Sequence, residues 1–308
     1  MQPCLIALDW GTTSLRAYLM ARDGTILRQQ AGGRGIMQVD NGRFEAALQE
    51  MAGEWLRDFP HLPLIASGMV GSKQGWREAP YCACPASVDA IASRIVVLEF
   101  GNGQRLHIVP GLAHTDISSG VPDVMRGEET QIIGAVSDRG EHLVILPGTH
   151  SKWAKVVDGS IIAFSTWMTG EVYAALTQHT ILGRLMDLAA PHDDDAFGKG
   201  VRGALADPGA LLHHIFSART LGLFNQLGAA ALPSYLSGLL IGSEIGGALA
   251  SMGVAATGST GAPTLLGSPQ LVRSYQAALG IAGMSSVEGA ADCAASGLMA
   301  LAGKAHLV

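Results

Sequence analysis

A carboxylate followed by glycine and hydroxyl residues is the most informative arrangement in this chain. Asp9 ends the apolar run at residues 5–8, and the turn after Trp10 contains Gly11, Thr12, Thr13 and Ser14. Glycine lets a backbone approach an anion closely, hydroxyls donate hydrogen bonds, and a carboxylate can hold, through water, a metal that a nucleotide carries. The turn therefore predicts a phosphate-binding hairpin with Asp9 at the metal. The alternative is an edge hairpin without a ligand, since turn chemistry alone explains glycine and threonine.

A second pattern of apolar strand, Gly-Thr turn and strand occupies residues 142–159. Its turn contains Gly148 and Thr149, with His150 next along the chain. We expect backbone N–H groups of this turn to bind phosphate as well, the alternative being a plain connection between strands. A repeated hairpin predicts two related halves facing one cleft, with a boundary near residue 140. The predicted domains are residues 1–140 and 141–308.

A base for phosphoryl transfer has several candidates before the second hairpin. They are Asp116, Asp123, Glu128 and Glu129. A helix N-terminus stabilises a carboxylate through its dipole, so either glutamate can also be a helix-terminal residue without a chemical role.

Basic and polar residues around two glycine-rich segments favour an acidic substrate. Arg126 can hold a carboxylate through paired hydrogen bonds, and Lys73, Ser72 and Gln74 can share that role. The alternative is that these are solvated surface side chains. Trp76, in the same segment, fits a core position equally well.

Composition excludes several classes of protein. The formal charge of −6 and the lack of a basic run argue against a nucleic-acid partner. Ser237, Ser243 and Glu244 interrupt the most apolar segment, residues 235–256, so it predicts a buried helix, not a membrane span. The scattered cysteines and histidines predict reduced thiols and no metal site made of protein ligands alone. The first residues lack a basic signal segment, which predicts a cytoplasmic protein. Apolar, glycine-rich C-terminal helices favour a homo-oligomer.

Hydrophobic spacing predicts the elements that position these residues. Helices are expected at 44–59, 128–136, 172–188 and 290–302, strands at 64–69 and 105–111, and a strand, turn and helix at 264–279. Residues 121–127 predict a turn. The acidic residues 193–195 predict a solvated loop.

The segment from Asp9 to Arg16 resembles the first phosphate motif of the actin, Hsp70 and sugar-kinase superfamily. The resemblance implies an α/β protein of two ribonuclease-H-like domains, with mixed sheets flanked by helices, facing a nucleotide cleft: the actin-like ATPase fold. It also implies an adenosine contact at Gly267 and Ser268, although one glycine and a proline stand where the superfamily has two glycines. In glycerol-kinase-like enzymes the base is an aspartate at the place of Glu128. The resemblance therefore makes Glu128 or Glu129 the first candidate for the base, followed by Asp123 and then Asp116.

Four segments together resemble the 2-dehydro-3-deoxygalactonokinase family: residues 67–76, 122–131, 146–153 and 168–171. The resemblance implies phosphorylation of 2-dehydro-3-deoxy-D-galactonate at its 6-hydroxyl by ATP and Mg²⁺, in galactonate catabolism. The nucleotide-binding residues are then Gly11, Thr12, Thr13, Ser14, Gly148, Thr149, His150, Gly267 and Ser268. The sugar-acid contacts are Arg16, Gly68, Met69, Ser72, Lys73, Gln74, Trp76 and Arg126.

Two other functions use the same motifs. One is a kinase of this superfamily that acts on another sugar or sugar acid. The second is an ATP-binding protein without kinase activity, similar to actin, which a sugar-stimulated turnover would exclude.

Overall fold

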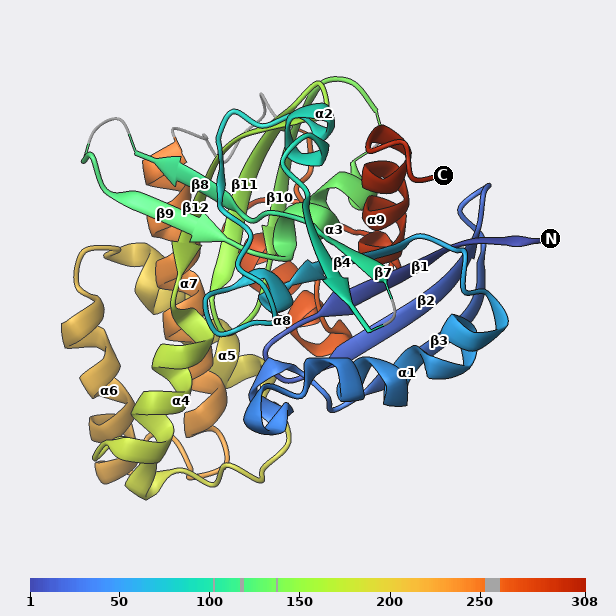
Figure 1. The fold of residues 1–308 in the computed structure, drawn as a ribbon. Helices are drawn as coiled ribbons and strands as arrows, with labels where there is room; N and C mark the ends of the chain where they lie inside the picture. The colour runs from blue at the N-terminus through green and yellow to red at the C-terminus, as the bar shows by residue number, and fades with distance from the viewer. Residues whose placement is uncertain (102, 117–118, 137, 253–260) are drawn as a thin grey trace. The chain divides into compact units, whose positions relative to one another are not determined.

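The computed structural model describes residues 1–101, 103–116, 119–136, 138–252 and 261–308 (Figure 1). The chain forms two compact units. Unit 1 comprises Met1–Glu141, Lys155–Phe164 and Ala290–Val308, and unit 2 comprises His142–Ala154 and Ser165–Gly289. Each unit is described by itself below.

Unit 1 is built on a six-stranded mixed sheet with the strand order β3-β2-β1-β4-β7-β6. Strands β1 and β4, and β4 and β7, pair in parallel, whereas the outer pairs are antiparallel. The parallel register places Asp9 beside Ser67 and Trp10 beside Gly68, so the carboxyl ends of β1 and β4 meet. The strands are β1 (Pro3–Trp10), β2 (Leu15–Ala21), β3 (Ile26–Gly32), β4 (Leu64–Gly68), β6 (Val96–Phe100) and β7 (Gln104–Ile108).

Helices and a small sheet complete unit 1. Helix α1 (Phe44–Asp58) packs on β2 and β3 through Leu48 and Trp55, as its apolar spacing predicts. The three-stranded sheet has the order β5-β8-β9. The remaining elements are α2 (Val88–Ala92), α3 (Glu128–Ala135), α9 (Cys293–Lys304), β5 (Cys82–Ala83), β8 (Leu112–Thr115) and β9 (Pro122–Met125).

Helix α9 belongs to unit 1, which differs from the expected division at residue 140. It packs against α3 and β1 (Figure 1). The two helices approach closely: a Cβ atom on Gly134 of α3 would lie 1.9 Å from the Cys293 carbonyl oxygen, and one on Gly297 would lie 1.9 Å from that of Thr130. Small residues on both helices therefore attach the C-terminus to the N-terminal unit.

Unit 2 contains most of a five-stranded sheet with the order β12-β11-β10-β13-β14, in which β10 and β13 are parallel. Helices α5 and α8 both pack on α7, and Trp153, Phe197 and Tyr275 fill the core. The strands are β10 (Glu141–Leu146), β11 (Ser151–Val157), β12 (Ser160–Trp167), β13 (Thr264–Leu265) and β14 (Val287–Glu288). The helices are α4 (Thr169–His179), α5 (Asp194–Ala206), α6 (Leu211–Leu223), α7 (Leu232–Met252) and α8 (Pro269–Ile281).

Two expected elements have different boundaries. The helix expected at 172–188 is α4 and ends at His179, because the backbone of Thr180 is extended (φ −122°, ψ 173°). The turn expected at 121–127 contains strand β9 instead, since these residues pair with β8. The buried helix expected at 235–256 is α7, and residues 253–256 lie outside the described residues.

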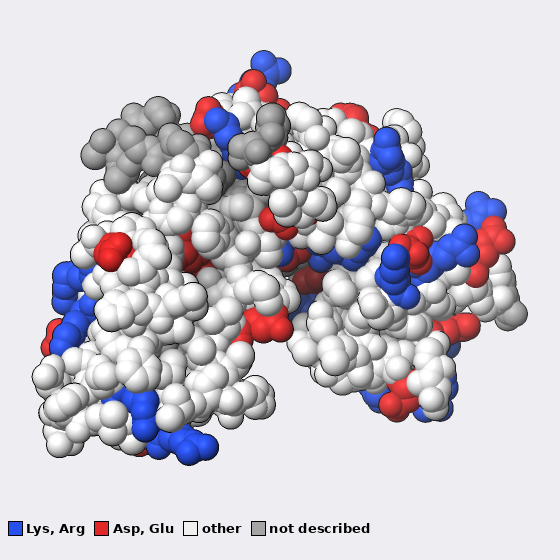
Figure 2. Space-filling view, turned by 90° about the vertical axis from the view of Figure 1, so that its left-hand side faces the viewer, with Lys and Arg blue, Asp and Glu red and all other residues white. Residues whose placement is uncertain are grey.

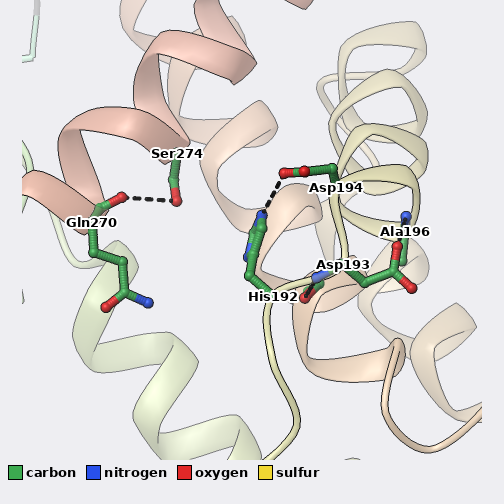
Figure 3. A network of polar contacts seen from close by, with 7 residues as sticks. His192, Asp193, Asp194, Ala196, Gln270 and Ser274 are labelled. Carbon is green, nitrogen blue, oxygen red and sulfur yellow. Dashed lines mark hydrogen bonds and ion pairs between the residues drawn. The ribbon is translucent and has the colours of Figure 1, made fainter.

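The prediction of a solvated loop at the acidic residues 193–195 is wrong, because these residues form the start of helix α5. The Asp193 carboxylate caps the helix by accepting the Ala196 N–H (2.9 Å), as Figure 3 shows. Asp194 and Asp195 occupy the first turn, where the helix dipole favours negative charge. His192 lies 3.4 Å from the Asp194 carboxylate. The three aspartates therefore form the N-cap and first turn of α5.

The surface of the described residues carries charges of both signs. On the face in Figure 2, basic and acidic side chains are interspersed, and neither sign forms a continuous patch among the described residues. No helix in the described part of the chain has the length and hydropathy needed to cross a bilayer.

Candidate active site

The first predicted phosphate turn is closed by its own backbone. The Gly11 N–H donates to the Ser14 carbonyl oxygen (2.9 Å). From the next segment, the Ile36 and Met37 N–H groups donate to the carbonyl oxygens of Gly11 (3.0 Å) and Thr12 (3.1 Å). The side chains of Thr12, Thr13 and Ser14 are exposed. The turn thus has a supported backbone and accessible hydroxyls, as an anion-binding turn requires.

Asp9 lies at the base of this turn. Its side chain is 16% exposed, and Arg16, its neighbour across β1 and β2, places Nη1 3.8 Å from its Oδ2. Burial raises the pKa of Asp9, Arg16 opposes that shift, and the negative charge of Glu128 adds to it. Asp9 and Glu128 are therefore close enough to repel each other.

The N-terminus of α3 meets the ends of β1 and β4 through two glycines. Gly68 and Gly127 have φ angles of +93° and +107°, which side-chain-bearing residues rarely adopt. A Cβ on Gly68 would lie 2.7 Å from the Trp10 carbonyl oxygen, and one on Gly127 would lie 3.2 Å from the Gly68 Cα. These glycines allow three backbone segments to converge beside Asp9.

The two candidate base glutamates have different environments. Glu129 is fully buried and accepts the Gly127 N–H (2.7 Å) and the Thr130 hydroxyl (3.1 Å). Burial, followed by the charge of Glu128, raises the pKa of Glu129 to about 8. Glu128 is half-buried and accepts the Arg126 N–H (2.9 Å). Glu128 is thus the more exposed of the two glutamates.

Arg126 is a buried cation with incomplete hydrogen bonding. Its side chain donates from Nη2 to the Ala79 carbonyl oxygen (2.8 Å), and its guanidinium carbon lies 4.4 Å from the centre of the Tyr81 ring. Gly71 makes room for it, since a Cβ there would lie 2.9 Å from Nη1. Nε and Nη1 are buried and have no hydrogen-bond partner among the described residues.

Two buried serines also have side-chain donors without a hydrogen-bond partner in the described part of the chain. They are Ser67 and Ser72. Leaving buried donors unpaired costs about 1–3 kcal/mol each, more for charged groups, so such groups indicate a ligand. Ser67 is the penultimate residue of β4 and lies beside Asp9, and Ser72 follows the Gly71 that lies next to Arg126. Ser67 was not among the site residues predicted from the sequence, where its only signal was its position near a strand end.

The other predicted sugar-acid contacts have varied positions. Lys73 and Gln74 are exposed. The Trp76 ring stacks on Phe44 at 6.1 Å and contacts Phe100 at 5.1 Å, so it packs against the core, as does Met69. The structure therefore gives Trp76 a packing role.

The remaining base candidates lie at the three-stranded sheet. Asp123 is on β9 and accepts the Val124 N–H (2.7 Å), and Asp116 follows β8 and accepts the Ser119 N–H (2.7 Å). Both carboxylates thus support local backbone.

In unit 2 the second predicted phosphate turn, residues 148–150, lies against the start of α4. The Glu171 N–H donates to the Thr149 carbonyl oxygen (3.0 Å), and a Cβ on Gly170 would lie 2.6 Å from the Gly148 carbonyl oxygen. The His150 ring pairs with the Glu171 carboxylate. The backbone of this turn is therefore supported by a helix from later in the sequence.

The predicted adenosine segment also contacts this hairpin within unit 2. A Cβ on Gly267 would lie 3.3 Å from the Pro147 carbonyl oxygen. Ser268 is the N-cap of α8, where its hydroxyl accepts the Leu271 N–H (3.4 Å). The described residues of unit 2 thus place Gly267 beside the second turn.

A buried carboxylate in unit 2 was not selected as a site residue. Glu244 is 2% exposed and accepts hydrogen bonds from Trp153, Thr169 and Tyr275. Burial raises the pKa of Glu244, and these hydrogen bonds oppose the shift. Its signal in the sequence was a single acidic residue in an apolar helix.

Comparison with known proteins identifies relatives along most of the chain. A profile of the family described as 2-keto-3-deoxy-galactonokinase matches residues 9–301. A relative from Rhizobium meliloti, described as a probable 2-dehydro-3-deoxygalactonokinase, is 37% identical over 283 residues, which cover 91% of this chain and 90% of the relative. The 2-dehydro-3-deoxygalactonokinase of Escherichia coli K12 is 35% identical over 242 residues, or 78% of each chain.

Solved structures confirm the expected fold class. A crystal structure from Sinorhizobium meliloti, described as that of a 2-dehydro-3-deoxygalactonokinase protein, has a TM-score of 0.85 and 35% identity, and covers 97% of this chain and 98% of that one. The activator of 2-hydroxyisocaproyl-CoA dehydratase from Clostridium difficile, with bound ADPNP, has a TM-score of 0.51 and 9% identity, with coverages of 99% and 96%, and shows the fold alone.

The expected actin-like ATPase fold and the family resemblance are both confirmed. The chain belongs to the 2-keto-3-deoxy-galactonokinase family, a family of sugar-acid kinases.

Proposed function

We propose that this chain transfers the γ-phosphoryl group of ATP to the 6-hydroxyl of 2-dehydro-3-deoxy-D-galactonate. The family match and the names of its relatives support this substrate. The observation that carries the proposal is the buried Arg126 guanidinium with two unpaired nitrogens, beside Gly71. A guanidinium in this state fits a substrate that brings a carboxylate.

In the proposed site, Arg126 binds the carboxylate of the sugar acid. The unpaired hydroxyls of Ser67 and Ser72 donate to the same substrate. Ala79 and Tyr81 fix the guanidinium before the substrate arrives, so little freedom is lost on binding. A neutral sugar leaves Arg126 unpaired and is expected to bind weakly.

Glu128 acts as the base in this proposal. It accepts the proton of the 6-hydroxyl while that oxygen attacks the γ-phosphorus, and the bond from the γ-phosphorus to the β,γ-bridging oxygen breaks, releasing ADP. The Arg126 N–H orients the Glu128 carboxylate. Glu129, fully buried, supports the helix N-terminus instead.

The nucleotide is bound by the predicted phosphate turns. The turn from Gly11 to Ser14 and the turn from Gly148 to His150 offer backbone N–H groups and hydroxyls to phosphate oxygens. The segment at Gly267 and Ser268 is proposed to contact adenosine.

Asp9 is the residue proposed to hold Mg²⁺, which neutralises phosphate charge when it is bound with ATP. No cluster of three or more metal-ligating side chains exists among the described residues. A single carboxylate nevertheless fits, since Mg²⁺ in such sites keeps several waters and takes its other ligands from the phosphates. Arg16, 3.8 Å away, holds Asp9 in place.

The proposal is tested by measuring ADP release with Mg-ATP and a panel of acceptors. The panel contains 2-dehydro-3-deoxy-D-galactonate, its gluconate epimer, galactonate and neutral ketohexoses. We expect the galacto acid to have the highest kcat/KM. A higher value for a neutral sugar would contradict the role of Arg126, and one for another acid would change the substrate but keep the mechanism. ATP hydrolysis without any sugar dependence would favour the non-kinase alternative.

Arg126→Met tests the contact that carries the proposal. Loss of a charged hydrogen-bonded pair costs about 1.5–3 kcal/mol, so KM for the sugar acid should rise about 10- to 100-fold while KM for ATP stays within about twofold. Arg28→Met is the control, because the Arg28 side chain is 54% exposed and forms an ion pair with the exposed Glu54. An unchanged sugar-acid KM in Arg126→Met would refute the carboxylate contact.

Cytoplasmic location and homo-oligomerisation remain predictions.

A further inference from the structure

Glu244 has no part in the proposed transfer, yet it is the centre of a buried polar network in unit 2. It lies on α7, and its Oε1 accepts the Trp153 indole N–H (2.8 Å). Its Oε2 accepts the Tyr275 hydroxyl (2.6 Å) and the Thr169 hydroxyl. A carboxylate buried among apolar helices is costly unless each oxygen is satisfied, and here both are.

The network has a defined direction. The single Tyr275 hydroxyl proton is donated to Glu244, so in the contact between Ser151 Oγ and Tyr275 Oη (2.9 Å) the serine is the donor. The Ser151 oxygen then keeps its lone pairs for the Gly148 N–H, which lies 3.5 Å away. Through Tyr275 and Ser151, Glu244 therefore sets the orientation of a hydroxyl that faces the backbone of the second phosphate turn.

The same carboxylate also holds the other flank of that turn. Thr169, which donates to Glu244, is the first residue of α4. The next two residues contact the turn directly: Gly170 packs on Gly148, and the Glu171 N–H donates to Thr149. Glu244 thus connects to residues on both sides of residues 148–150 without contacting the turn itself.

We infer that Glu244 is a positioning residue that holds residues 148–150 in the conformation that binds nucleotide phosphates, acting through Tyr275 and Ser151 on one flank and Thr169 on the other. The inference rests on the proposed function, in which this turn binds ATP. Its expected signature is a selective loss of nucleotide affinity, because the contacts of the sugar acid lie in unit 1 on other residues.

Tyr275→Phe and Tyr235→Phe form a matched pair for the test. Both tyrosines are buried in unit 2, and each contacts a serine hydroxyl: Ser151 for Tyr275 and Ser217, at 2.7 Å, for Tyr235. Only Tyr275 also donates to Glu244. The two variants remove the same atom from similar surroundings, so their difference reports the connection to Glu244.

Titration calorimetry of each variant with ADPNP and Mg²⁺, without sugar, measures the effect. We expect Tyr275→Phe to raise the Kd about tenfold, the equivalent of one net hydrogen bond, and Tyr235→Phe to change it less than twofold. In steady-state assays Tyr275→Phe should raise KM for ATP while KM for the sugar acid stays unchanged. Equal Kd values for the two variants and the wild type would overturn the inference.

Thr169→Val tests the second flank and does not depend on the tyrosine. It keeps the shape of the side chain and removes the donor to Glu244, and we expect a Kd for ADPNP raised about three- to tenfold. A lower melting temperature with an unchanged Kd in both Thr169→Val and Tyr275→Phe would show a purely structural network and overturn the inference. A failure of the proposed function can be distinguished from a failure of this inference. If the wild type binds ADPNP but phosphorylates no sugar acid, the kinase proposal is refuted, and the ADPNP comparison still tests the role of Glu244.

Discussion

Units 1 and 2 each bury a glutamate next to a segment proposed for phosphoryl transfer, but they satisfy it differently. Glu129 in unit 1 receives hydrogen bonds from Gly127 and Thr130, two residues and one residue away in sequence. Glu244 in unit 2 receives them from Tyr275, Thr169 and Trp153, which are 31, 75 and 91 residues away. Burial raises the pKa of both carboxyl groups.

This difference shows two ways of supporting a glycine-rich segment. Around Glu129 the support is local, because a helix N-terminus presents backbone N–H groups to any carboxylate placed there. Around Glu244 the support exists only once α4, α7, α8 and β11 are packed together. A change at Glu129 should therefore disturb one helical turn, and a change at Glu244 should disturb four elements.

The largest expected effect is on kcat and distinguishes Glu128 from Glu129. Glu128→Gln should lower kcat about 10²- to 10⁴-fold, because it removes the proposed general base, with a small change in either KM. Glu129→Gln should lower kcat less than tenfold, since a fully buried side chain supports the helix start and does not meet the substrate.

Steady-state kinetics of both variants, with circular dichroism to establish folding, make this comparison. A folded Glu129→Gln with the larger loss in kcat would reverse the assignment of the two residues.

An intermediate effect compares the two buried glutamates directly. Chemical denaturation at pH 7 should show that Glu244→Gln lowers the free energy of unfolding by about 3 kcal/mol, because the amide NH2 group of glutamine would face a hydrogen-bond donor in this buried network. Glu129→Gln should cost about 1 kcal/mol or less, since Glu129, with a pKa of about 8, is mainly protonated at pH 7 and glutamine resembles that form. Equal losses would show that local and long-range support are equivalent here.

The smallest expected effect is a pH dependence in unit 1. The folded pKa of Glu129, about 8, lies above its ordinary value of 4.5, so between these values the native state binds a proton that the unfolded state lacks. The free energy of unfolding should therefore fall as pH rises, by about 2 kcal/mol from pH 6 to pH 8.

Urea denaturation at several pH values measures this slope in the wild type and in Glu129→Gln. The slope should be smaller in the variant, because glutamine does not titrate. An identical slope in both proteins would assign the pH dependence to other groups.

The parts of the chain with local signals were predicted well. Helix α1 follows from apolar residues spaced three and four apart, and β1 with its Gly-Thr-Thr-Ser turn follows from an apolar run that ends in a carboxylate. The family membership was also evident from short motifs, and the comparisons confirm a sugar-acid kinase. The acidic run at 193–195 was misassigned because an N-cap and a solvated loop have similar composition, and only the Asp193 contact distinguishes them.

The sequence by itself determined the two turns, their order and the presence of two glutamates at a helix start, because those features depend on residues close together in the chain. Tertiary structure alone decided that Glu128 is partly exposed while Glu129 is buried, that Ser67 and Arg126 both hold unpaired donors, and that Glu244 is connected to residues 148–150. It also placed α9 in unit 1. These outcomes depend on packing between segments far apart in the sequence, and local composition contains no measure of which segments will meet.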